Sequence, residues 1–267
     1  ESQWIDLPDE AVVEDVEWVK KQALGRAERR QEAGLSPEAF LVKVRELKQE
    51  RHRVIIVLHT FAGGRRKLDI QHYVEEFAVE YGVAIFFFGV DLAFDHRWDL
   101  ADPKLIAMLL EMIEQGLIDI ILGAPPCATW SDLSKEERAR VTEANVLLFN
   151  LLALCDAEEQ HGGGYLFEHP ADPEEEPYPS VWDLEAVKGM LGRHGVRTTR
   201  IDQCMYGGPA QKPTTLASNL DGIQEQAVLC DGRHRHEKAY GKNERGIFRS
   251  RRLQAYPPGL CRMIALS

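Results

Sequence analysis

A cysteine that follows two prolines is well placed in this sequence for covalent chemistry. Cys127 ends the segment Gly-Ala-Pro-Pro-Cys, which comes directly after the apolar run 118–122. A thiolate is a strong nucleophile, but an ordinary thiol has a pKa of about 8.5, so we expect a helix N-terminus or a nearby positive charge to lower the pKa of Cys127. The prolines restrict the backbone, which would make the thiol project into a cleft instead of turning inward.

Glycines and acidic residues follow other apolar runs at comparable positions. Phe61-Ala62-Gly63-Gly64 comes after the first run, Asp91 and Asp95 come after the second, and Asp99 lies shortly beyond. A glycine turn allows a cofactor to approach the backbone, and an acid at the end of the next strand can accept both hydroxyls of a ribose. The series therefore indicates an adenosine-containing cofactor. Asp91 is favoured over Asp95 as the ribose acid because it is nearer the strand end.

Alternating strands and helices must position these residues. Apolar runs of strand length precede them, and amphipathic segments separate the runs. The expected strands are 54–58, 83–90, 118–122, 165–167, 196–201 and 214–217. The expected helices are a pair within 9–50 that breaks at 33–34, then 70–81, 103–115, 135–159 and 180–194. This alternation predicts an α/β fold whose mostly parallel sheet has helices on both faces, with sites at the carboxyl ends of its strands.

Charge and cysteine content restrict the partners and the environment. The net charge is −11, but Lys and Arg outnumber Asp and Glu two to one after residue 195. That basic end fits either a face that binds a polyanion or a solvated surface. The five widely spaced cysteines indicate reduced thiols rather than a disulfide framework. Because no apolar run could cross a bilayer and the start lacks a secretory pattern, we expect an intracellular protein without a membrane partner.

In their order along the chain, these motifs resemble those of the C5-cytosine-specific DNA methyltransferases. That family's cofactor turn is similar to 61–63, its ribose acid to Asp91 and its adenine-side acid to Asp99. Its Pro-Pro-Cys loop matches 125–127, and its Glu-Asn-Val element is represented by Glu168-His-Pro.

Two later segments extend the resemblance. DQCMYGGPAQKPTTLASNL (202–220) is similar to the family's Tyr-Gly-x-Pro segment, and AYPPGLCRMIA (255–265) is similar to its terminal Pro-Pro element. The resemblance runs from about residue 54 to residue 266, and it includes methyltransferase domains carried by some retroelement and phage proteins.

The resemblance implies a Rossmann-like S-adenosyl-L-methionine methyltransferase fold and methyl transfer to carbon 5 of cytosine in duplex DNA. Cys127 would add to carbon 6 of a base flipped out of the stack. Glu168 would hydrogen-bond ring nitrogen 3 and the exocyclic amine, and Lys212 would contact the base carbonyl or the adjoining phosphate. The residues expected to bind the cofactor are Phe61, Ala62, Gly63, Gly64, Asp91, Asp99, Leu100, Pro125 and Pro257.

The same resemblance divides the chain into four parts. They are an N-terminal helical extension (1–52), the catalytic core (53–219), a short basic target-recognition segment (220–252) and a C-terminal element that returns to the core (253–267). Because the recognition segment is short, target specificity could be low or supplied by other parts of a longer polypeptide. The arginines expected to contact nucleic acid are Arg233, Arg235, Arg249, Arg251 and Arg252, and for the last three we favour a clamp on the nucleic-acid backbone over a solvated surface.

Cys230, His234 and His236 are candidates for a separate role. Thiolate and imidazole ligands suit zinc, and Cys204 or Cys261 could supply a fourth ligand. Their spacing is not that of a standard zinc motif, so we favour basic loop residues that face phosphate over a metal site.

Three functions are compatible with the sequence. The first is methylation of cytosine in DNA, by a protein found in the nucleus or wherever its target DNA lies. The second is the same chemistry on RNA such as tRNA. The third is a nucleic-acid-binding module of the same fold without methyl transfer, because His59, Arg65 and Arg66 stand where the family's turn has an acid and further glycines.

Overall fold

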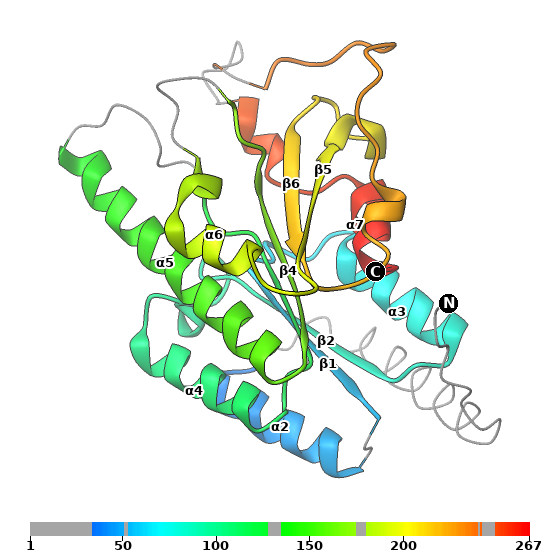
Figure 1. The fold of residues 1–267 in the computed structure, drawn as a ribbon. Coiled ribbons are helices and arrows are strands. Elements are labelled where there is room, and N and C mark those ends of the chain that lie inside the picture. Colours follow the sequence, from blue (N-terminus) through cyan, green and yellow to red (C-terminus); the bar gives the residue numbers. More distant parts are fainter. Residues whose placement is uncertain (1–33, 51–52, 128–134, 175–179, 240, 242–248) are drawn as a thin grey trace.

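The centre of the fold is a six-stranded sheet that helices cover on both faces (Figure 1). The computed structural model describes residues 34–50, 53–127, 135–174, 180–239, 241 and 249–267. The strands are β1 (Ile55–Thr60), β2 (Ile85–Val90), β3 (Ile120–Gly123), β4 (Gly164–Pro170), β5 (Arg197–Asp202) and β6 (Pro213–Ser218). The helices are α2 (Pro37–Glu50), α3 (Ile70–Tyr81), α4 (Pro103–Glu114), α5 (Lys135–Gln160), α6 (Glu185–Leu191) and α7 (Pro258–Ala265). The short 3₁₀ helices are η1 (His96–Trp98), η2 (Val181–Asp183), η3 (Gln203–Tyr206), η4 (Gln224–Gln226) and η5 (Arg249–Leu253).

The strands lie in the order β2-β1-β3-β4-β6-β5. The first four of these strands pair in parallel, whereas β6 is antiparallel to both β4 and β5. The predicted α/β class and mostly parallel sheet are therefore confirmed. Since the chain adds β2 on one side of β1 and β3 on the other, a crevice is expected beyond the carboxyl ends of β1 and β3. Residues 61–64 and 124–127 follow those two strand ends.

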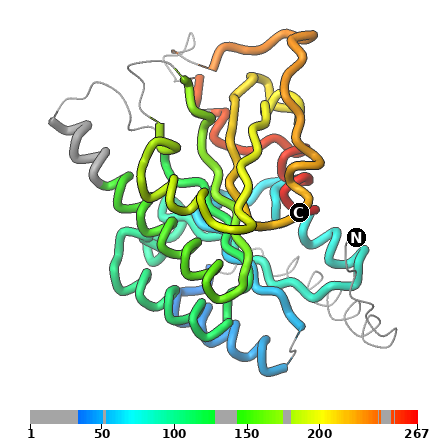
Figure 2. The backbone as a smooth tube through the Cα atoms, viewed as in Figure 1, coloured from blue at the N-terminus to red at the C-terminus, as the bar shows by residue number. Residues whose placement is uncertain are grey.

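Alternate residues of the strands enter two hydrophobic clusters, one on each face of the sheet. Ile56 and Leu58 pack on the face that α2, α4, α5 and α6 cover, while Val57 and Leu122 pack on the face that α3 and α7 cover. Figure 2 shows how the end of the chain returns so that α7 lies beside α3, which it contacts. No helix in the described ranges is both long enough and apolar enough to cross a membrane.

Helix α2 belongs to the core of the protein. Its Phe40, Val44 and Leu47 are fully buried, and Phe40 stacks on Phe88 of β2. The helix begins as the sequence predicts, because the Ser36 hydroxyl accepts a hydrogen bond from the Ala39 N–H at 3.2 Å. The other predicted N-terminal helix falls within residues 1–33, which lie outside the described residues.

Two predictions near β4 are wrong, one about a helix and one about the end of the strand. The helix expected over 180–194 is interrupted, because Leu184 has an extended backbone between η2 and α6. The Trp182 indole donates to the Pro170 carbonyl at 2.8 Å, which holds η2 against the end of β4. Strand β4 itself continues to Pro170, since its last residues pair with β6, so Glu168 lies within the strand and not after it.

Candidate active site

Close packing fixes the segment that leaves β3. A Cβ atom on Gly123 would lie 2.6 Å from the Leu151 δ-carbons and 2.8 Å from Thr60 Oγ1, so a side chain has no room there. The Thr60 hydroxyl donates to the Leu122 carbonyl at 3.0 Å and ties the ends of β1 and β3 together. Pro125 is buried and Cys127 is exposed, which leaves the thiol at the carboxyl end of the sheet. The remainder of the predicted catalytic loop, 128–134, is outside the described residues.

Glu168 and Lys212 lie close enough to the Cys127 thiol for both of their charges to change its pKa. Partial removal of water around the sulfur raises the pKa of Cys127, the carboxylate of Glu168 raises it further, and the ammonium of Lys212 lowers it by less. The expected lowering of this pKa is therefore wrong for the protein without ligands, because one lysine does not outweigh burial and a neighbouring carboxylate. The thiol therefore ionises at a higher pH than an ordinary thiol, and a proton on Glu168 would remove the smaller of the two causes that raise its pKa.

Glu168 combines burial with an unsatisfied oxygen. Its carboxyl group accepts a hydrogen bond from the Tyr256 hydroxyl, while Oε1 has no hydrogen-bond partner among the described residues. Burial raises the pKa of Glu168, and Lys212 and Tyr256 counteract that rise only in part. A buried polar atom without a partner costs free energy that a ligand can recover. Oε1 is thus available to a ligand with hydrogen-bonding groups.

The C-terminal element holds the lysine and the glutamate of this site. Lys212 Nζ donates to the Leu253 carbonyl at 3.0 Å and lies 5.8 Å from the centroid of the Tyr256 ring. Lys212 also has a φ of +41°, an uncommon value for a residue with a side chain. Sequence reasoning did not single out Tyr256. Its place beside Pro257 was the one available signal, and no spacing connected it to Glu168.

The glycine turn after β1 is tied to Asp91 at the end of β2. The Gly63 N–H donates to Asp91 Oδ2 at 3.0 Å, and the Ala93 N–H donates to Oδ1 at 2.8 Å. Phe61 has a φ of +56°, which is uncommon for an aromatic residue. A Cβ atom on Gly64 would lie 2.8 Å from the Phe94 ring. The turn therefore has a defined backbone conformation beside a carboxylate that retains lone pairs for a ligand.

The other acidic residues of this region have different partners. Asp95 pairs with Arg97 at 2.6 Å, and the hydrogen bonds from that guanidinium lower the pKa of Asp95. Within the described part of the chain, Asp91 has no ion-pair partner. Asp99 accepts a hydrogen bond from the Ala101 N–H at 2.9 Å, and the neighbouring Leu100 is buried. Compared with Asp95, Asp91 therefore has more capacity to accept hydrogen bonds from a bound molecule.

Pro257 lies where the C-terminal element meets the rest of the site. It is buried and immediately precedes α7. The Arg66 guanidinium, shortly after the glycine turn, lies 3.5 Å from the Cys261 sulfur in α7. Gly259 lies against Tyr206, whose carbonyl oxygen would be 2.7 Å from a Cβ atom. The element thus contacts both the segment after β1 and the loop between β5 and β6.

The arginines predicted to bind nucleic acid occupy two segments. Arg233 and Arg235 are exposed, although Arg233 lies 3.6 Å from Asp231. In the second segment, Arg252 is ion-paired with Glu237, and the Arg249 N–H donates to the Gly241 carbonyl at 2.9 Å. The side chain of Arg251 is outside the described residues. Arg235 has no ion-pair partner in the described part of the chain, whereas Arg252 is already partly neutralised.

The sulfur and imidazole residues named from the sequence also come together. Cys230, His234 and His236 are joined by Cys204, at the end of β5, and not by Cys261. This group is separate from Cys127 along the chain.

The charge environment of Cys127 leads to a test by thiol alkylation. Because its pKa is raised, the rate at which iodoacetamide labels Cys127 should keep rising with pH beyond the range in which an ordinary thiol is fully ionised. Glu168→Gln removes a negative charge, lowers the thiol pKa and moves the midpoint to lower pH. Lys212→Gln removes a positive charge and moves the midpoint of the plot of labelling rate against pH to higher pH. Mass spectrometry of the peptide that contains Cys127 measures both midpoints.

A matched control separates local charge from general effects on the protein. Glu185→Gln changes an exposed carboxylate in α6 and should leave the midpoint unchanged. Shifts in the same direction for Glu168→Gln and Lys212→Gln would contradict the arrangement described for Cys127.

These observations define an α/β protein in which a thiol, a buried carboxyl group and a lysine meet at the carboxyl end of a mostly parallel sheet. No protein-family model and no curated protein matches the chain. Any functional assignment therefore depends on this arrangement of residues.

Proposed function

We propose that this protein is an S-adenosylmethionine-dependent methyltransferase with a Rossmann-like fold that methylates carbon 5 of cytosine in DNA. The observation that carries the proposal is the meeting of Cys127, Glu168 and Lys212 at one end of the sheet. The glycine turn and its carboxylate, Asp91, follow β1 and β2 at that same end. A nucleophile for a base and a candidate cofactor turn therefore share the crevice expected at the switch point.

The cofactor half of the site fits an adenosine with a ribose. Asp91 retains lone pairs for two hydroxyls, and the turn at 61–64 brings backbone rather than side chains to the crevice. Asp99, Leu100, Pro125 and Pro257 would be the other residues that hold the cofactor. When bound, S-adenosylmethionine supplies a methyl group on a positively charged sulfur.

The base half of the site fits nucleophilic activation of cytosine. Carbon 5 of cytosine is a poor nucleophile, so the Cys127 thiolate adds to carbon 6, forming an S–C bond and moving an electron pair toward carbon 5. Glu168, whose pKa burial raises, donates a proton to ring nitrogen 3 as that charge develops. Once the cofactor had supplied the methyl group to carbon 5, loss of the carbon 5 proton to water would expel the thiolate from carbon 6, and nitrogen 3 would return its proton to the Glu168 carboxylate, which restores the aromatic ring.

The proposed substrate is a cytosine in DNA, which has to be presented to Cys127 outside the base stack. A base inside a duplex cannot reach Cys127, so it must be flipped at a cost of a few kcal/mol. Arg233 and Arg235 are exposed on a segment beyond β5 and could neutralise phosphates during docking. The proposal places the protein wherever its DNA substrate lies.

Transfer of a labelled methyl group from S-adenosylmethionine tests the proposal. Duplex DNA and tRNA are supplied in parallel and then in competition, and label on carbon 5 of DNA cytosine is expected. Label on tRNA alone would support the same reaction with RNA as the substrate in place of DNA. Absence of label on both, together with calorimetry that detects no S-adenosylmethionine binding in the presence of DNA, would favour the non-catalytic binding module.

A pair of carboxylate variants tests the cofactor half. Asp91→Asn should weaken S-adenosylmethionine binding by about 10-fold or more, since it removes a charged acceptor for the ribose hydroxyls. The amide oxygen can accept only one of the two backbone hydrogen bonds that Asp91 accepts, so part of the loss in affinity would come from the turn itself. Asp95→Asn alters the ion pair with Arg97 and the cap of η1, both outside the contacts of the glycine turn, and should change the affinity by less than about 2-fold. Calorimetric titration measures both, and a larger effect from Asp95→Asn would reverse the assignment.

A further inference from the structure

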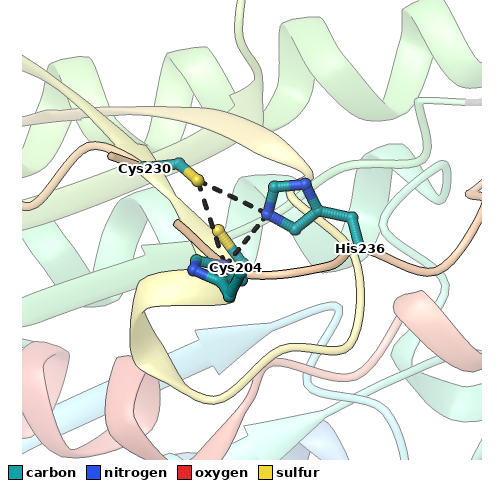
Figure 3. A group of neighbouring side chains, drawn as sticks. Cys204, Cys230 and His236 are labelled. Carbon is teal, nitrogen blue, oxygen red and sulfur yellow. Dashed lines mark hydrogen bonds between the residues drawn. The ribbon is translucent and has the colours of Figure 1, made fainter. Parts of the chain in front are cut away.

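Two thiols and two imidazoles converge beyond the carboxyl end of β5 (Figure 3). Cys204 lies in η3, directly after β5, and the other three side chains come from the segment 229–238. The members of this Cys/His cluster are Cys204, Cys230, His234 and His236. Their ligand-capable atoms all lie within 4.8 Å of one another. The two histidines are exposed and the two cysteines are half-buried, so a dissolved ion can reach the cluster.

The separations within the cluster are close to those of a tetrahedral metal shell. Sγ of Cys230 lies 3.4 Å from Nε2 of His236 and 3.9 Å from Nε2 of His234, and the two Nε2 atoms are 3.0 Å apart. Bond lengths of about 2.3 Å to sulfur and about 2.0 Å to nitrogen place tetrahedral sulfur and nitrogen ligands about 3.6 Å apart, and two nitrogens about 3.3 Å apart. We propose that a zinc ion binds between the four side chains of the Cys/His cluster.

Hydrogen bonding alone accounts poorly for this convergence. Two neutral imidazoles can share one N–H···N bond, and thiols are weak donors and acceptors. An ion that accepts lone pairs from every member explains why both histidines turn the same ring nitrogen, Nε2, toward Cys230. Two sulfur and two nitrogen ligands in tetrahedral positions are characteristic of zinc among the common divalent metals.

Surrounding groups hold the ligands in place. The Cys230 N–H donates to Asp202 Oδ2 at 2.8 Å, and the Gly232 N–H donates to the Cys230 sulfur at 3.3 Å. Gly232 adopts a φ of +71°, which favours glycine, at the turn that directs its N–H to the sulfur. Oδ1 of Asp231 lies 3.9 Å from Nδ1 of His234, on the nitrogen that does not enter the cluster. Outer groups of this kind orient metal ligands.

Four protein ligands leave no open position on zinc, so the ion would have a structural role. The Cys204 N–H donates to the Gln211 carbonyl, one residue before Lys212, so the ion would stabilise the loop between β5 and β6. It would also fix the segment 229–238, in which Arg233 and Arg235 alternate with the ligands. On binding, the two thiols become thiolates and release two protons to solvent. The inference does not depend on the proposed methyl transfer.

Metal titration of the reduced, chelator-treated full chain tests the zinc site. We expect uptake of about one zinc ion per chain, and cobalt in its place should give the intense visible bands and thiolate charge-transfer absorption of a tetrahedral site. Cys230→Ser and His236→Ala should each lose this binding. Cys127→Ser and His194→Ala, a matched thiol and a matched exposed histidine outside the cluster, should retain it.

Limited proteolysis gives a second readout that needs no substituted protein. Trypsin cleaves after arginine, so a chelator should speed cleavage after Arg233 and Arg235 by about 10-fold or more, and added zinc should reverse the change. Failure of the reduced wild-type chain to take up zinc or cobalt would overturn the inference. Full binding by a folded Cys230→Ser variant would also overturn it. If that variant does not fold, wild-type titration and proteolysis decide the question.

Discussion

Substitution of Cys127 by serine should reduce methyl transfer to cytosine by about 1,000-fold or more, because a serine hydroxyl is far less nucleophilic than a thiolate toward carbon 6. The geometry around this residue is set by Gly123 and Pro125 rather than by the sulfur. The variant should therefore fold normally and bind S-adenosylmethionine and DNA as the wild type does. Initial rates of label incorporation measure the loss.

A trapped adduct makes the same prediction more specific. In DNA that carries 5-fluorocytosine, carbon 5 holds fluorine in place of the proton whose loss would expel the thiolate. Wild-type protein should therefore remain covalently attached to this DNA through the peptide that contains Cys127, whereas Cys127→Ser should not. Activity of Cys127→Ser within about 10-fold of wild type would refute the covalent mechanism.

Glu168→Gln should lower kcat by about 100-fold or more, since an amide cannot transfer a proton to ring nitrogen 3. Glutamine is close to glutamate in size and can still hydrogen-bond the base, so KM should change much less than kcat. Single-turnover rates with saturating DNA separate the two parameters.

Tyr256→Phe is the companion variant for Glu168. The Tyr256 hydroxyl donates to the Glu168 carboxylate and thereby lowers its pKa. Removing that hydroxyl should raise the pKa of Glu168. Glu168 would then keep its proton to a higher pH, so the pH at which its deprotonation lowers the rate should be higher in the variant than in the wild type. Loss of the hydrogen bond should cost the rate about 10-fold. A loss in Glu168→Gln no greater than that in Tyr256→Phe would argue against proton donation by Glu168.

Local signals in the sequence were sufficient for most elements of the fold. Helix α4 begins after Asp102, which caps it, and the chain turns at Gly116, as the pattern predicts. The prediction of one continuous helix over 180–194 was wrong because the contact between Trp182 and Pro170, which are 12 residues apart, overrides local helix propensity. The position of β6, antiparallel between β4 and β5, could not be predicted either, because the periodicity of a strand does not specify which strands it pairs with.

The candidate site was less predictable than the fold. The ends of the predicted strands identified Cys127 and Asp91 as candidate site residues, because the turns that follow parallel strands meet at one edge of the sheet. The direction of the Cys127 pKa shift was wrong, since it depends on burial and on the charges of Glu168 and Lys212 together. Tyr256 was missed because its contact with Glu168 joins residues far apart in the sequence, and no spacing rule describes such a contact.

The returning C-terminal element has a consequence for biosynthesis. Leu253 supplies the carbonyl that holds Lys212, and Tyr256 supplies the hydroxyl that holds Glu168. A nascent chain still on the ribosome will expose Cys127 and Glu168 well before either of these partners has left the exit tunnel. Assembly of the pocket therefore has to wait until Tyr256 has been synthesised and released, and termination before Tyr256 would produce a polypeptide that has the thiol without these two contacts.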